Sequence, residues 1–426
     1  MIAKLLCSAL LAVPVPQERT DGGPTVPVPC VVTAVPGVAA RAFWLALPFG
    51  PAHDPAASPG LARVLARALL DGLPAQSAER AVEVFQTPTT TFVGRVVLHD
   101  EFEAALAHGA RLLAGELPLD DAGLIRARDR AVLRADDETV VLPGPVLRGR
   151  AARRLLAPPD AAAAHAIPER LYALDAAALR AAFRERVAAS GALCVVLGGE
   201  DEAADRARCE AVLVGPPRGA PLPVRSVAQE PEPAESTHDL AEAVFVVAAI
   251  RAPAREAAEF WPFAVGMELL RVRVARAFHE FRGAELRAEF PMLEYDPVLA
   301  PPLAFVERRG AKADEPAAVR AEIAAVLAAL VERPPTAAEL AAAVAKLRSE
   351  FRAPPFDERT RLGLLARQPS VLLRCGKVAI LRALSGFTTA GLDAIEPASV
   401  HATLAARTAP DALEWVVLLP AARGAD

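Results

Sequence analysis

Aromatic side chains are scarce in this chain of 426 residues, and neither sign of charge dominates it. Phe, Trp and Tyr make up 5% of the residues although 53% are hydrophobic, so alanine, leucine and valine must supply the core, as is typical of helix-rich packing. The net charge of −5 and the lack of a basic stripe with interleaved aromatics argue against a nucleic-acid-binding or anionic-membrane surface. The length predicts two domains of about 200 residues each.

The apolar run near the N-terminus is too short to span a bilayer. It extends from Leu5 to Val15 and is interrupted and followed by prolines at positions 14 and 16, which break helices. Because Lys4 precedes the run and a polar stretch follows it, residues 1–22 are predicted to be a signal peptide, and the protein to be exported to a bacterial periplasm. A cytoplasmic protein with an N-terminal tail is the alternative, because no clear small-x-small cleavage site is present.

Cysteines and histidines are few, and their spacing is not that of metal ligands. Cys30 and Cys194 lie in apolar, strand-like runs, which predicts buried and inert thiols. The seven histidines form no H-x-x-H or H-x-x-x-H pair, and no G-x-S-x-G signature marks a serine nucleophile. His53 and Asp54 precede an expected helix and indicate turn and N-terminal capping chemistry. These patterns by themselves predict no metal, no cofactor and no catalytic residue.

Both halves of the chain follow the same order of predicted elements. A proline-rich segment at 215–239 is expected to be the linker between domains at 23–214 and 240–426. The first half has strands at 26–37, 40–50 and 85–100, helices at 101–117, 120–135 and 174–189, and a strand at 192–199. The second has strands at 243–253 and 302–311, helices at 259–283, 318–334 and 336–352, and a strand at 416–421. This repetition predicts a duplicated domain of strands and helices.

Residues 60–72, GLARVLARALLDG, predict a helix that buries one face between two glycines. Arg63, Ala66 and Arg67 fall at positions i, i+3 and i+4 of this helix, close enough to act on one ligand. Neither an arginine nor an alanine is a usual metal ligand or general base. The helix therefore has the geometry of a site without obvious chemistry.

The longer stretch FWLALPFGPAHDPAASPGLARVLARALLDG, residues 43–72, resembles the strand, turn and helix of the pitrilysin/insulinase family of zinc metallopeptidases, the inverzincins. The resemblance extends over residues 26–420 and includes the segments 147–199 and 265–290. It implies an α+β fold of two homologous domains, each a mostly antiparallel sheet flanked by helices, that forms one half of a clamshell. In active members the helix carries His-x-x-Glu-His, whose histidines bind zinc and whose glutamate activates water.

This sequence departs from that motif at all three positions. Arg63 and Arg67 replace the histidines and Ala66 replaces the glutamate. A guanidinium stays protonated and has no lone pair to give a metal. The glutamate that serves as a further zinc ligand corresponds to the stretch DRAVLRADDE, residues 129–138, where Asp136 is the nearest acidic residue. The family's substrate-anchoring arginine corresponds to Arg282, and its tyrosine falls near alanine 288.

Three roles for Arg63 and Arg67 remain open from the sequence. They are surface arginines above a buried helix face, or they pair with Asp136, Asp137 or Glu138 and so join two helices formerly bridged by metal. In the third role they attract acidic peptides or carboxylates of a partner.

The resemblance as a whole implies a catalytically inactive peptidase subunit without metal or cofactor. Its partner would be an active homologous zinc peptidase, and the heterodimer would complete a peptide-binding chamber. The alternatives are a homodimer that binds peptides or serves as a structural scaffold, and a hydrolase with an unrecognised site. No nucleic acid and no membrane span are expected.

Overall fold

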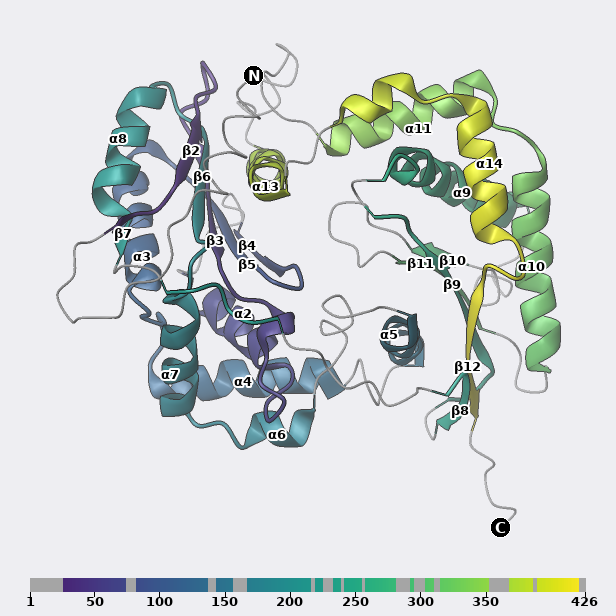
Figure 1. Cartoon of the computed structure of the whole chain (residues 1–426), viewed down its shortest axis with the longest axis horizontal. Coiled ribbons are helices and arrows are strands. Elements are labelled where there is room, and N and C mark those ends of the chain that lie inside the picture. The colour runs from purple at the N-terminus through teal and green to yellow at the C-terminus, as the bar shows by residue number, and fades with distance from the viewer. Residues whose placement is uncertain are drawn as a thin grey trace. The chain divides into compact units, whose positions relative to one another are not determined.

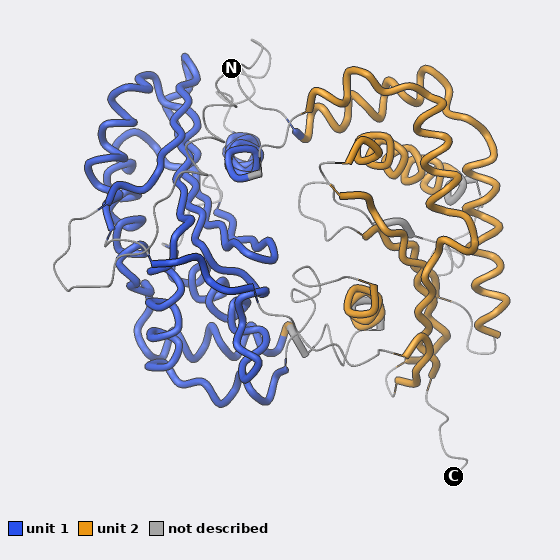
Figure 2. Tube along the Cα trace, in the orientation of Figure 1, with its two compact units in different colours: residues 1–133, 166–226, 351–388 blue, residues 134–165, 227–350, 389–426 orange. Residues whose placement is uncertain are grey.

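Two compact units make up the part of the chain that the computed structural model describes (Figures 1 and 2). Unit 1 comprises residues 1–133, 166–226 and 351–388, and unit 2 comprises residues 134–165, 227–350 and 389–426. The described residues are 26–73, 82–136, 143–155, 167–215, 219–224, 233–238, 241–254, 257–280, 292–294, 303–309, 315–351, 368–385 and 389–420. None of the helices within these ranges has the length and apolar character needed to cross a membrane.

Unit 1 is built on a five-stranded sheet with one parallel pair at its edge. The order across the sheet is β2 (Cys30–Thr33), β6 (Leu193–Gly198), β3 (Arg41–Leu47), β5 (Thr91–Val97) and β4 (Val82–Gln86). Only β2 and β6 are parallel. The strand region predicted at 85–100 is thus a hairpin, because a turn at residues 87–90 reverses the chain. A separate two-stranded sheet pairs β1 (Val26–Pro27) with β7 (Val214–Gly215).

Unit 2 repeats this topology strand for strand. The order is β8 (Glu235–His238), β12 (Glu414–Pro420), β9 (Phe245–Arg251), β11 (Leu303–Arg309) and β10 (Met292–Glu294). The pair β8 and β12 is again parallel, and the other pairs are antiparallel. The predicted α+β fold of two mostly antiparallel sheets flanked by helices is therefore confirmed.

Helices cover both faces of the first sheet. One face packs against α2 (Leu61–Asp71), α3 (Phe102–Leu113), α4 (Asp121–Asp136), α7 (Ala176–Val187) and α8 (Glu202–Val212), with which Phe43, Leu45 and Leu47 form one core. The short elements η1 (Pro51–His53), η2 (His99–Glu101) and α6 (Pro168–Tyr172) connect them. The opposite face carries α13 (Pro369–Ser385), seen end-on in Figure 1.

Trp44 fixes α13 on its face of the sheet. The indole Nε1 donates to the Leu373 carbonyl of α13 at 3.0 Å. A Cβ at Gly94 of β5 or at Gly376 of α13 would lie 2.5 or 2.6 Å from the indole, too close for any real side chain. Glycine on both sides of the ring thus allows the sheet and the helix to approach each other.

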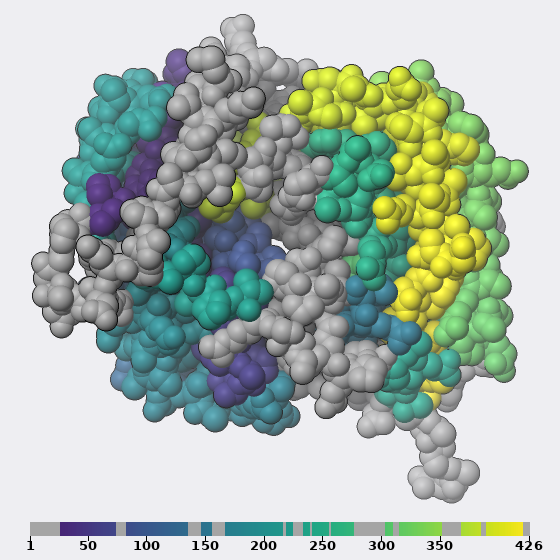
Figure 3. All heavy atoms as spheres, in the orientation of Figure 1, coloured from purple at the N-terminus to yellow at the C-terminus, as the bar shows by residue number. Residues whose placement is uncertain are grey.

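In unit 2, α9 (Phe260–Glu280), α10 (Pro316–Glu332) and α14 (Pro397–Thr408) lie on one side of the sheet, with α11 (Ala337–Glu350) against α9 and η6 (Ala390–Ala394) before α14. In the view of Figure 3, α14 lies at the surface, in yellow. The other face is covered by α5 (Pro143–Leu155), whose Val146, Leu147 and Ala151 share a core with Val247 and Val416.

Each unit therefore includes one helix from the other half of the sequence. Helix α5 precedes the Pro-rich segment but packs on the second sheet, and α13 follows that segment but packs on the first. The predicted domains 23–214 and 240–426 differ from the compact units at these two helices. Segment 215–239 also contributes β8 to the second sheet and a bridge from Gly219 to Ala189. Periodicity identifies a buried helix face but not the sheet that covers it, which is why the sequence did not indicate the exchange.

Candidate functional site

Helix α2, which carries Arg63, Ala66 and Arg67, begins at a buried cap. Asp54 accepts hydrogen bonds from the backbone N–H of Gly60 at 2.9 Å and of Ala62 at 2.8 Å. Arg186 of α7 lies 3.6 Å from the same carboxylate, and both side chains are buried. Burial raises the pKa of Asp54 to about 7, although Arg186 and the two N–H groups lower it. The capping chemistry predicted for this turn is confirmed.

Arg63, Ala66 and Arg67 are half-buried and share one side of α2, while the residues between them face the core. Arg67 Nη2 lies 2.8 Å from Asp71 Oδ1, four residues later on the same helix. Asp71 Oδ2 lies 3.3 Å from Nη1 of Arg130 on α4. A chain of charges, Arg67 to Asp71 to Arg130, thus links α2 to the helix on which the third zinc ligand was expected.

Asp71 and Arg130 were missed by the sequence reasoning, although the i, i+4 spacing of Arg67 and Asp71 was a visible signal. Asp136 ends α4, but its side chain lies outside the described residues, as do positions 137 and 138. The ion pairs predicted to those three acidic residues stay predictions. Arg282 also lies outside the described residues.

Arg63, Ala66 and Arg67 offer no atom that binds a cation or removes a proton from water. Both arginine side chains are donors only, and alanine has no functional group. The two arginines on this helix face can bind carboxylates, and Arg67 already forms an ion pair with Asp71.

Among the described residues, the one group of three potential metal ligands is Cys30, Cys194 and Cys209. Their Sγ atoms all lie within 4.8 Å of one another. The cysteines that are scattered in the sequence are therefore gathered in space, which the ligand-spacing rule did not detect. The histidines whose side chains the structure describes, at 53, 99, 108, 238 and 401, belong to no such group.

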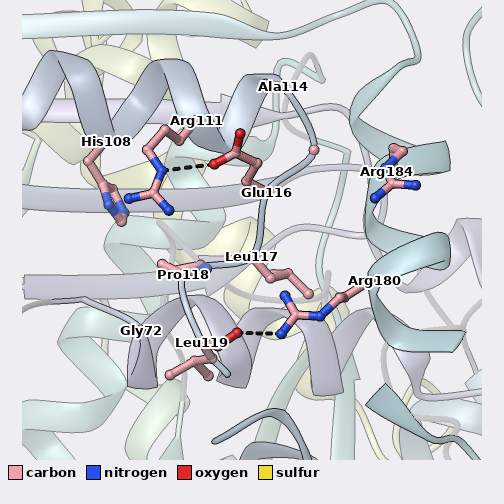
Figure 4. A pocket seen from close by; sticks show the side chains of 11 residues that line it. Gly72, His108, Arg111, Ala114, Glu116, Leu117, Pro118, Leu119, Arg180 and Arg184 are labelled. Carbon is pink, nitrogen blue, oxygen red and sulfur yellow. Dashed lines mark hydrogen bonds and ion pairs between the residues drawn. The ribbon is translucent and has the colours of Figure 1, made fainter. Parts of the chain in front are cut away.

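A basic cavity of about 740 Å³ lies at the C-terminal ends of α2 and α3, beside α7 (Figure 4). Arg111 in this lining pairs with Glu116 at 2.8 Å, and Arg180 donates to the Leu119 carbonyl at 2.7 Å. Burial, with nearby arginines, lowers the pKa of His108 to about 4. Neither Arg63 nor Arg67 lines this cavity. The lining residues are Gly72, His108, Arg111, Ala114, Gly115, Glu116, Leu117, Pro118, Leu119, Arg180 and Arg184.

No family model matches the sequence, and no curated protein matches it. Solved structures, in contrast, match nearly the whole chain. The crystal structure of a peptidase M16 inactive domain from Pseudomonas fluorescens superposes with a TM-score of 0.63 at 16% identity, over 93% of this chain and 97% of that one. The chain has the M16 peptidase fold.

Two further solved structures share the M16 fold. A protease from Helicobacter pylori matches with a TM-score of 0.67 and 12% identity, over 93% of this chain and 99% of that chain. The periplasmic protease PqqL from Escherichia coli matches with a TM-score of 0.61 and 13% identity, over 91% of this chain but 44% of that longer one. The M16 fold thus occurs both in proteins named proteases and in one named an inactive domain, so the fold alone does not decide whether this chain cuts peptides.

Proposed function

We propose that this chain is a catalytically inactive, insulinase-like peptidase subunit that pairs with an active zinc peptidase homologue to complete a peptide-binding chamber. The observation that carries the proposal is the side of α2 that holds Arg63, Ala66 and Arg67 at the spacing of the family's zinc ligands and general base. The M16 fold supports the correspondence of α2 to the motif helix.

The argument for inactivity is chemical. A zinc peptidase needs two neutral imidazoles to hold the metal and one carboxylate to take a proton from its water. Two guanidinium groups at the ligand positions would repel a divalent cation, and the Arg67 side chain is held by Asp71 at 2.8 Å. The link from Asp71 to Arg130 gives α2 and α4 an attachment that does not require metal.

The argument for a partner rests on length. The chain matches almost all of the Helicobacter pylori and Pseudomonas fluorescens chains but less than half of PqqL. One copy of this chain therefore corresponds to about half of the longer protease, and an active homologue would supply the other half. The periplasm is the proposed location, in keeping with the predicted signal peptide at 1–22 and with the periplasmic PqqL.

The direct test is affinity purification of the full chain from its native source, followed by mass spectrometry and peptide hydrolysis. We expect a homologous chain with an intact His-x-x-Glu-His to co-purify, and we expect peptide cleavage by the pair but not by this chain alone. Metal-dependent cleavage by this chain alone would refute inactivity. Recovery of a homodimer without any peptidase would favour the peptide-binding scaffold instead.

A gain-of-ligand variant tests the assignment of the motif positions. Arg63→His, Ala66→Glu and Arg67→His together should bind Zn²⁺ at least roughly tenfold more tightly than a control with two histidines but no organised surroundings. The matched control places the same motif on an exposed side of α10, as Ala318→His, Ala321→Glu and Glu322→His. Equal affinity for the two variants, measured by competition with a chromogenic chelator, would contradict the assignment.

A further inference from the structure

Three cysteines from distant parts of the chain meet between the first sheet and α8. The register of the parallel pair β2 and β6 places Cys30 beside Cys194, and α8 brings Cys209 against them. Cys194 and Cys209 are completely buried, and Cys30 is half-buried. Every pair of Sγ atoms in this thiol triad is separated by no more than 4.8 Å.

The elements that carry the triad are held together by charged contacts. Arg206 of α8 donates to the Cys30 carbonyl at 3.2 Å, which ties the helix to β2. One residue earlier, Asp205 of α8 forms a bidentate ion pair with Arg41 of β3, at 2.7 and 3.0 Å. The three sulfur atoms are therefore presented by a fixed sheet and a fixed helix, as a preorganised ligand set requires.

We propose that the thiol triad binds one Cu(I) ion in a three-coordinate, all-sulfur site. Thiolates are the ligands that soft cations such as Cu(I) prefer, and three are present. Zn²⁺ requires a fourth ligand, and the described residues add no further histidine, cysteine or carboxylate to this group. This site is separate from α2 and is independent of the function proposed above.

The size of the triad fits such an ion. A metal–sulfur bond of about 2.3 Å, taken from zinc thiolates, places three sulfurs in a plane about 4.0 Å apart. The observed Sγ separations reach at most 4.8 Å, so small side-chain rotations that move each sulfur by a few tenths of an ångström bring the three atoms to this spacing. The closed position between sheet and helix would also protect Cu(I) from water and oxidants.

Metal binding exchanges thiol protons for metal–sulfur bonds. The Cys30 thiol donates to the Val28 carbonyl at 3.2 Å, so its proton is among those that the metal displaces. Binding releases the three thiol protons and forms three Cu–S bonds, with no change in the oxidation state of the copper. The Arg206 guanidinium offsets part of the negative charge that results.

The test is a Cu(I) competition on the full-length, reduced chain under anaerobic conditions. It is made in a Cys7→Ser background, which leaves the triad and Cys375 as the only cysteines. Cys375→Ser is the matched control, because Cys375 is also buried in unit 1 but lies on α13, across the sheet. Cys30→Ser is the primary loss variant because Cys30 is the least buried member, and circular dichroism checks its fold.

We expect one Cu(I) per chain in the background protein and in Cys375→Ser, with affinity lower by at least roughly a hundredfold in Cys30→Ser and Cys209→Ser. Cu(I) should raise the Tm of the first two proteins only, because a ligand that binds the native state stabilises it. X-ray absorption should show three sulfur ligands. The proposal is overturned if a folded Cys30→Ser or Cys209→Ser protein retains the affinity, or if Zn²⁺ competes equally.

Discussion

Removal of one partner from the Arg41–Asp205 pair should strongly destabilise unit 1. Arg41 Nε lies 2.7 Å from Asp205 Oδ2 and Nη2 lies 3.0 Å from Oδ1, with 4% and 1% of the two side chains exposed. Asp205→Ala leaves a buried guanidinium without its carboxylate, which costs about 3–5 kcal/mol of unfolding free energy. Joint replacement by Arg41→Met and Asp205→Leu removes both charges and should recover most of this loss.

The exposed pair Arg111–Glu116 provides a control at nearly the same distance. Its atoms are 2.8 Å apart, but the side chains are 63% and 55% exposed, so water screens the attraction. Glu116→Ala should therefore cost about 0–1 kcal/mol. The comparison separates the effect of burial from the effect of distance.

Urea unfolding followed by tryptophan fluorescence measures these differences in unit 1 alone. Of the three tryptophans, only Trp44 belongs to unit 1, so the variants are made with Trp261→Phe and Trp415→Phe. At about 2–4 °C per kcal/mol, Asp205→Ala should also lower the Tm by roughly 6–20 °C. A cost below about 1 kcal/mol for Asp205→Ala, or a double variant less stable than Asp205→Ala, would refute the argument from an unpaired buried charge.

Three further outcomes are expected. Asp54→Ala removes the acceptor for two backbone N–H groups at the start of α2 and should lower the free energy of unfolding by about 2–3 kcal/mol. Amide hydrogen exchange in the first turn of α2 should also become faster, and unchanged exchange would contradict the capping role of Asp54. The pKa of His108 is about 4 in the folded protein against 6.5 in the unfolded chain, so between these pH values the unfolded chain binds more protons and stability should fall as pH falls from 6.5 to 4. In His108→Gln, the contribution of this histidine to the pH dependence of the urea midpoint should vanish. An unchanged pH dependence would show that another group causes it. Gly376→Val places a side chain against the indole of Trp44 and should lower the free energy of unfolding by about 1–3 kcal/mol, with a red shift of the Trp44 fluorescence. An unshifted spectrum would show that α13 tolerates the added volume.

Local pattern predicted the elements whose own residues determine them. The 3.6-residue spacing of α2 and the apolar runs of β3, β6 and β9 are properties of short segments, and the structure has each of them near the predicted bounds. The repeat of strand order in the two halves confirmed the duplication. The correspondence of Arg63, Ala66 and Arg67 to the motif positions rests on the resemblance of α2 to a known helix and stays a prediction.

Contacts between distant segments could not be predicted in the same way. Cys30 and Cys194 meet because β2 and β6 pair in parallel. The sequence of neither strand shows which strand it pairs with. Cys209 joins them only because α8 folds back over that pair. The role of Asp71 differs, because its spacing from Arg67 was local information and only its second partner, Arg130, required the fold.

The exchange of α5 and α13 makes the two units dependent on each other during synthesis. The first sheet is fully translated by residue 198, but the helix that covers its Trp44 face lies at 369–385. During synthesis, the Trp44 face of the first sheet therefore stays uncovered until nearly the whole polypeptide has been translated. A chain cut within 215–239 would yield two fragments that each lack a covering helix, and they should fold only when they are expressed together.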